Sequence, residues 1–230
     1  MLNLEDYYDE IPLALHYFNQ GNFEKAIEIY STILDATNPD EETVPYLYLQ
    51  YANALIKNAN QYFTDEIVNI DKGYDLNRRR EIEDDIENAW NVLEQSKLCF
   101  TILKDDASLA KTHFLLGEIS LLNNDFSTSI QDYVECINLY NKIQSEPSEY
   151  YDVYLSMGSA YEFLEDYEQS NKYYQECVNL MGEECEDLVM KIQENKFKME
   201  NPKEVEKVSV EVNDDDGVVR DINCNKKRVN

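Results

Sequence analysis

The chain has 230 residues, of which 47 are acidic and 20 basic, giving a formal net charge of −27. A surface this acidic repels nucleic acid and anionic membranes, and it attracts basic proteins and cations. Six glycines and five prolines are few for this length. Since sheet proteins need many tight turns, the composition favours helices over a β-sandwich or barrel.

Residues 7–37 contain the first copy of a spaced pattern of small and aromatic residues. Ala14 is followed nine positions later by Phe23, then by Ala26, Tyr30 and Ile33 at intervals of three, four and three. Small side chains on two facing helices let their backbones approach closely, and the later aromatic is expected to face the next helix pair. The pattern therefore predicts a helical hairpin that repeats along the chain.

Residues 43–104 are predicted to form a second hairpin that is interrupted. Ala52 and Ser96 are its small positions, and they lie 44 residues apart instead of twelve, so about 32 residues are inserted. The insert, residues 57–88, contains nine acidic and five basic residues. It could extend the two helices, project as a loop, or do both. Trp90, which follows the insert, is expected to pack in the core.

The third and fourth hairpins are predicted at residues 109–143 and 150–182. The small positions of all four units are Ala14 and Ala26, Ala52 and Ser96, Gly117 and Ser129, and Gly158 and Ser170. We expect an all-α, right-handed tetratricopeptide-repeat solenoid within residues 1–200.

Residues 184–199 are predicted to cap the solenoid, because Leu188, Ile192 and Phe197 recur at roughly helical spacing. Residues 201–230 hold seven acidic and six basic residues and few apolar ones, so we expect a disordered charged tail. Nearly all of the net charge therefore belongs to the helical domain. No signal peptide or membrane span is predicted. Five widely spaced cysteines favour free thiols in a reducing compartment.

The interrupted second repeat resembles the NASP (SHNi-TPR) family of histone chaperones. Three phrases carry the resemblance: Ala89-Trp90-Asn-Val-Leu93 with Lys97, residues 110–120 (Ala-Lys-Thr-His-Phe-Leu-Leu-Gly-Glu-Ile-Ser), and Gly158-Ser-Ala-Tyr161. It implies a non-enzymatic chaperone that binds histones H3 and H4, escorts them to the nucleus and serves nucleosome assembly. Nuclear residence, with shuttling to the cytoplasm, is implied as well.

Two features differ from the family pattern. The family's insert is often a long acidic run, whereas this insert is short and contains Arg78, Arg79 and Arg80, which argues against histone capture by the insert. The family's C-terminal basic signal is matched only by Lys226, Lys227 and Arg228, which are the candidate nuclear-import residues.

No enzymatic motif is present, and no cofactor or metal site is predicted. His16 and His113 are about two repeats apart, and no His-Glu-x-x-His, Walker or dinucleotide-binding pattern occurs. The cysteines lack Cys-x-x-Cys spacing. Cys136 and Cys177 occupy equivalent repeat positions, which favours core packing over redox chemistry.

Candidate binding residues lie along the first helix of each hairpin, which lines the concave face of such a solenoid. Carboxylates would receive histone lysines and arginines, and apolar side chains would hold histone side chains. The candidates are Tyr46, Asn53, Glu118, Leu121, Asp152, Ser159, Glu162 and Phe163. The simpler reading is that several of them only pack between helices.

The main alternative is a generic tetratricopeptide scaffold or co-chaperone that binds a non-histone peptide. Co-chaperones that hold an acidic peptide end need Lys or Arg in the groove, and none of the nominated positions is either. An enzyme lacks a supporting motif, and a nucleic-acid binder is disfavoured by charge. The sequence leaves three questions open: which variant of histone H3 is preferred, whether the protein forms a homodimer, and which assembly factor or acetyltransferase complex receives the cargo.

Overall fold

The computed structural model describes residues 2–69, 75–181 and 185–201. These residues form nine α-helices and two short 3₁₀-helices. The elements are η1 (Leu4–Asp6), α1 (Ile11–Asn19), α2 (Phe23–Ala36), α3 (Val44–Val68), α4 (Leu76–Leu103), α5 (Asp106–Leu122), α6 (Phe126–Ile143), η3 (Pro147–Tyr150), α7 (Tyr151–Phe163), α8 (Tyr167–Met181) and α9 (Glu186–Glu200). The all-helical prediction is confirmed.

Polar side chains fix where several helices begin. Asn22, Asp75, Asp105 and Asp125 stand before α2, α4, α5 and α6, and each accepts a hydrogen bond from a backbone N–H of the first turn. After α4 and α6, Lys104 and Gln144 adopt left-handed backbone conformations that end the helix.

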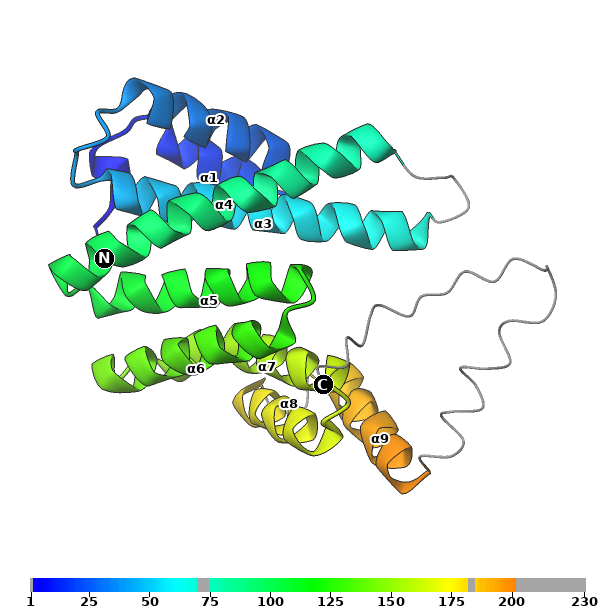
Figure 1. Cartoon of the computed structure of the whole chain (residues 1–230). Coiled ribbons are helices and arrows are strands. Elements are labelled where there is room, and N and C mark those ends of the chain that lie inside the picture. Colours follow the sequence, from blue (N-terminus) through cyan, green and yellow to red (C-terminus); the bar gives the residue numbers. More distant parts are fainter. Residues whose placement is uncertain (1, 70–74, 182–184, 202–230) are drawn as a thin grey trace, which may run out of the picture.

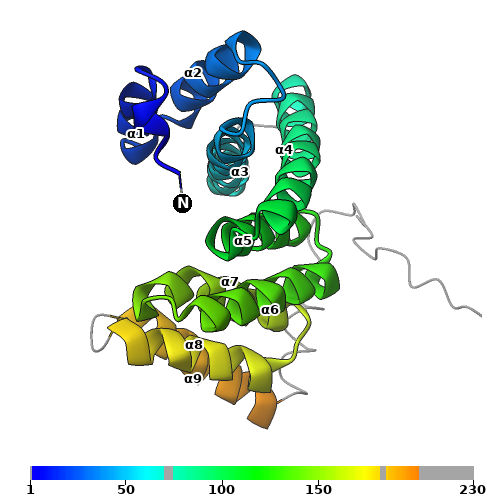
Figure 2. The same ribbon diagram turned by 90° about the vertical axis from the view of Figure 1, so that its left-hand side faces the viewer.

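Each helix packs against its neighbours in sequence. The contacts run from α1 with α2 through α3 with α4, α5 with α6, and α7 with α8, and each pair also contacts the next. Figure 1 shows the α1–α4 group at one end and α5–α9 at the other, and Figure 2 shows the same succession end-on. Among the described residues, no helix is both long and apolar enough to cross a membrane.

The insert extends both helices of the second pair. α3 continues to Val68 and α4 begins at Leu76, so most of residues 57–88 is helical, and the two helices lie side by side well past the end of α5 (Figure 1). Residues 70–74 lie outside the described part of the chain. The sequence left open whether the insert extends the two helices, projects as a loop, or does both. In the described residues it extends the helices.

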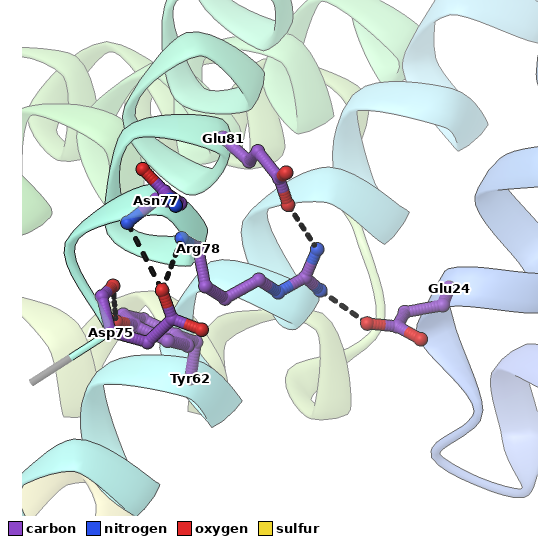
Figure 3. Close-up of polar contacts among 6 residues, drawn as sticks. All are labelled: Glu24, Tyr62, Asp75, Asn77, Arg78 and Glu81. Atoms are coloured by element: carbon purple, nitrogen blue, oxygen red, sulfur yellow. Dashed lines mark hydrogen bonds and ion pairs between the residues drawn. The ribbon is translucent and has the colours of Figure 1, made fainter.

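Two arginines of the insert hold this extension in place. Arg78 forms ion pairs with Glu24 at the start of α2 and, at 3.1 Å, with Glu81 on its own helix (Figure 3). Arg79 lies 3.3 Å from Glu66 of α3. Asp75 also accepts hydrogen bonds from the backbone N–H groups of Asn77 and Arg78, which begins α4 (Figure 3). Arg78 therefore ties the insert to α2, and Arg79 ties the two helical parts of the insert to each other.

All eight predicted small positions are buried. At two of them even a methyl group would not fit: a Cβ atom on Gly117 would lie 2.5 Å from Tyr133, and one on Gly158 would lie 2.4 Å from Tyr174. The repeated tyrosine therefore rests on the small residue of its own hairpin. The expectation that it would only face the next hairpin was incomplete.

The last helix, α9, packs against α8. Leu188 and Ile192 of α9 are buried in a cluster with Tyr174 and Cys177 of α8. Asn195 is also buried and donates a hydrogen bond from Nδ2 to Oγ of Ser170 at 3.2 Å. Phe197 is 54% exposed, so its expected role in this apolar face was wrong. The predicted disordered tail lies outside the described residues except for Asn201.

Trp90 corrects another expectation. Its side chain is 48% exposed on α4, whereas Ala89 and Leu93 on the same helix are completely buried. A helix carries one buried stripe, and Trp90 follows Ala89 by a single residue, which turns it about 100° away from that stripe.

Candidate functional site

An inner hollow is formed where the first helices of the pairs approach one another. Its volume is about 490 Å³, and it receives side chains from α1, α3, α5 and α7 as well as from α6 and η3. This cavity is called the inner hollow below. Its lining residues are Phe18, Asn53, Lys57, Lys111, Phe114, Leu115, Tyr140, Ser148, Glu149, Asp152 and Val153. The folding of distant hairpins into one stack is what brings these positions together.

The inner hollow has apolar walls and charges of both signs. Phe18, Phe114, Leu115 and Val153 supply apolar surface, while Glu149 and Asp152 supply carboxylates. Lys57 and Lys111 are also present, and Nζ of Lys111 lies 4.0 Å from a carboxylate oxygen of Glu149. A suitable occupant would therefore combine apolar, cationic and anionic groups.

The two lysines were missed by the sequence reasoning, which found no cation among its nominated positions. Lys57 follows Asn53 by four residues, and Lys111 precedes Phe114 by three, so each shares a helix face with a residue that lines the hollow. That spacing was the available signal. It could not be used fully because the insert obscured where the face of α3 ended.

Two of the eight candidate residues, Asn53 and Asp152, line the inner hollow. Tyr46 lines a smaller hollow of about 160 Å³ between η1, α1 and α3. Its hydroxyl donates a hydrogen bond to Asp105 at 2.9 Å, and its ring contacts Phe100 edge to face. Burial and this bond raise the pKa of Tyr46 to about 12. Tyr46 thus joins α3 to the start of α5.

Glu118 contacts the repeated tyrosine of its own hairpin. The hydroxyl of Tyr133 donates a 2.6 Å hydrogen bond to the Glu118 carboxylate. Burial raises the pKa of Tyr133 well above its ordinary value, and the charge of Glu118 adds to this effect. Leu121, one turn further along α5, packs partly buried against the cluster that contains Tyr133.

Glu162 makes the equivalent contact in the fourth hairpin. Tyr174 donates a 2.7 Å hydrogen bond to Glu162, and the Ser159 hydroxyl lies 3.2 Å from the same tyrosine oxygen. Lys191 and Lys198 of α9 lie 3.4 Å and 3.6 Å from the Glu162 carboxylate. Burial would raise the pKa of Glu162, but the hydrogen bond from Tyr174 and the two lysines lower it. Glu162 therefore fastens the capping helix.

Phe163 is the most exposed of the aromatic candidates. Its side chain is 64% exposed at the end of α7, and its ring stacks on Phe126 with a 5.0 Å separation of centroids. This pair links the first residue of α6 to the last residue of α7. It presents aromatic surface at a place distinct from the inner hollow.

His113, Cys136 and Cys177 make polar or packing contacts within the fold. Nδ1 of His113 lies 2.8 Å from Asp132 of α6. Cys136 and Cys177 are completely buried, and burial raises the pKa of both thiols to about 12, so they are packing residues as predicted. No group of three or more His, Cys, Asp or Glu side chains suited to a metal ion occurs in the described part of the chain.

Comparison with known families identifies two stretches of the chain. Residues 110–146 match the SHNi-TPR model, and residues 151–180 match a tetratricopeptide-repeat model. The chain carries an SHNi-TPR repeat. The first match covers most of α5 and all of α6, including Glu118, and the resemblance to the SHNi-TPR family is thereby confirmed.

A distant relative points the same way. The chain is 26% identical over 107 residues to histone-binding protein N1/N2 of Xenopus laevis; the match spans 42% of this chain and 17% of the relative. The similarity thus covers only a small part of that longer protein. Both family models describe binding repeats, and neither indicates a catalytic family.

Solved structures support the fold. The thermophilic TPR protein TTC0263 of Thermus thermophilus superposes with a TM-score of 0.55 at 14% identity, covering 80% of this chain and 78% of that one. BtubC (BKLC) of P. vanneervenii gives 0.51 at 12% identity, covering 94% and 85%. The chain therefore has an all-helical TPR-like fold.

Proposed function

We propose that this protein is a histone chaperone that holds a basic segment of the H3–H4 pair in its inner hollow. Support comes from the hollow itself, to which α1, α5 and α7 contribute apolar side chains and η3 and α7 contribute carboxylates, and from the distant similarity to a histone-binding protein. As part of the same proposal, the four helix pairs are four repeats, of which the second is lengthened by the insert.

The chemistry of the hollow suits a histone segment. Phe114 and Val153 would contact apolar histone side chains, and Asp152 and Glu149 would receive arginine or lysine. Lys57 and Lys111 would face a histone carboxylate. The acidic body would speed the encounter and keep the cargo from nucleic acid. Storage, escort to the nucleus and delivery for nucleosome assembly follow as roles; Lys226, Lys227 and Arg228 lie outside the described residues.

Charge reversal at Asp152 tests the hollow directly. Asp152 is exposed at the start of α7, so replacing it should not disturb packing. Asp152→Lys should weaken binding of H3–H4 about tenfold. Asp84→Lys, at an exposed position on α4 outside the hollow, changes the net charge by the same amount and serves as the control. Affinity is measured by fluorescence titration at two salt concentrations. Equal effects of the two substitutions would mean that only overall charge matters.

A non-histone peptide remains the second candidate, and one observation favours it. Asn53, Lys57 and Lys111 line the same hollow, and an amide with two ammonium groups could hold a peptide carboxylate. Lys57→Ala and Lys111→Ala together should then abolish binding of acidic peptides, whereas Asp152→Lys should not weaken it. If H3–H4 binding does not depend on Asp152 but acidic peptides bind, the scaffold function replaces the histone function.

A further inference from the structure

A second groove lies between the segment before α3, the start of α3 and the end of α4. It has a volume of about 390 Å³ and runs between residues 39–48 and the last two turns of α4. None of its lining residues belongs to the inner hollow. It is called the outer groove below.

The floor of the outer groove is an apolar stripe on α4. Cys99, Ile102 and Leu103 lie on one face at helical spacing, while Ser96 and Phe100 on another face are buried against α3. Ile102 is 80% exposed and Leu103 is 54% exposed. A helix whose second apolar face is this exposed offers a surface for a partner.

The opposite wall supplies charge. Asp40, Glu41 and Glu42 are consecutive residues of the groove, and all three are exposed. Val44, Pro45 and Tyr48 continue the wall with apolar surface. An occupant must therefore bury apolar side chains against α4 and present positive charge to residues 40–42.

We propose that the outer groove binds a cationic amphipathic helix of a partner protein, separately from the occupant of the inner hollow. Such a helix places apolar residues at intervals of three and four on Ile102 and Leu103, with lysines or arginines beside the three carboxylates. A second copy of this chain fits less well. Its net charge of −27 opposes association, and a symmetric contact would bring two acidic walls together.

The proposal is tested on the full chain with a fluorescent model helix of leucine and lysine, and with a leucine–glutamate helix as the opposite charge. Ile102→Asp should weaken binding of the basic helix tenfold or more, because the apolar contact is lost. The new carboxylate does not repel a basic helix, so a loss of affinity would report on the apolar contact. Ile67→Asp is the matched control, since Ile67 is 75% exposed and lies outside the groove. It should change affinity less than twofold.

Other outcomes would overturn the proposal. Equal effects of Ile102→Asp and Ile67→Asp would remove the groove as the binding site, and so would equal binding of the acidic helix. If Asp152→Lys weakened the basic helix as much as Ile102→Asp, the helix would occupy the inner hollow. A dimer in analytical ultracentrifugation that Ile102→Asp converts to monomer would make a second copy the occupant. Loss of H3–H4 binding in Ile102→Asp would show that the outer groove is part of the histone-binding site.

Discussion

Replacing Gly117 with alanine tests the central packing contact of the repeats. A Cβ atom at this position would lie 2.5 Å from Cε1 and 2.7 Å from Cδ1 of Tyr133, closer than real side chains approach. Tyr133 is completely buried, and its hydroxyl is held by Glu118 at 2.6 Å. The ring therefore cannot move away without losing that hydrogen bond.

Two opposing effects set the magnitude. Alanine is favoured over glycine inside a helix by about 1 kcal/mol. Overpacking a tight core costs about 1–3 kcal/mol, and weakening a hydrogen bond to a charged group costs about 1.5–3 kcal/mol. We therefore expect Gly117→Ala to lower the free energy of unfolding by about 1.5–5 kcal/mol.

Urea unfolding followed by circular dichroism measures this difference, with Gly117→Ala/Tyr133→Leu as the compensating variant. If the ring causes the loss, the added methyl should be nearly harmless once the ring is gone. A Gly117→Ala protein as stable as the original, or more stable, would show that helix propensity dominates and that the close contact does not constrain the fold. Gly158→Ala, with its Cβ 2.4 Å from Tyr174, should repeat the result.

Two further predictions concern the same class of contacts. The hydroxyl of Tyr30 is buried without a hydrogen-bond partner among the described residues, so Tyr30→Phe should leave stability unchanged or raised, whereas Tyr133→Phe should lower it by about 1–3 kcal/mol; similar losses in urea unfolding would contradict this. The lowered pKa of Glu162 stabilises the fold above the carboxyl's ordinary pKa and loses this contribution as the pH falls through the folded-state value. Glu162→Gln should therefore cost about 1 kcal/mol at neutral pH and almost nothing in acid, and a difference independent of pH would contradict the ion pairs with α9.

The sequence predicted the helix pairs well because their packing requires small residues at fixed intervals. Ala14, Ser96 and Ser170 are all completely buried, even though 44 residues separate the two small positions of the second pair. Backbone contact tolerates few residue types, so it leaves a strong pattern. The repeat of Cys136 at Cys177 is explained in the same way, and both are buried.

The candidate site was less predictable because a hollow depends on how successive pairs are stacked. Asn53 and Asp152 meet in one hollow only because α3 and α7 are brought together across α5. Spacing within one helix does not contain that information. Lys57 was missed as a lining residue because the insert obscured where the face of α3 ended. The exposed Trp90 shows a related limit, since a shift of one residue changes the face on which a side chain lies.

Glu118 and Glu162, which the sequence analysis nominated for binding, make structural contacts in this fold. Each carboxylate accepts a hydrogen bond from the tyrosine that covers the glycine of its hairpin, and Glu162 also holds two lysines of α9. Reversing either charge would remove the acceptor for a buried hydroxyl and disturb the fold. A loss of histone binding in such a variant would therefore not identify a contact residue. Asp152 lines the hollow and is exposed, so its charge can be changed with the packing intact, and the proposed function depends on that position.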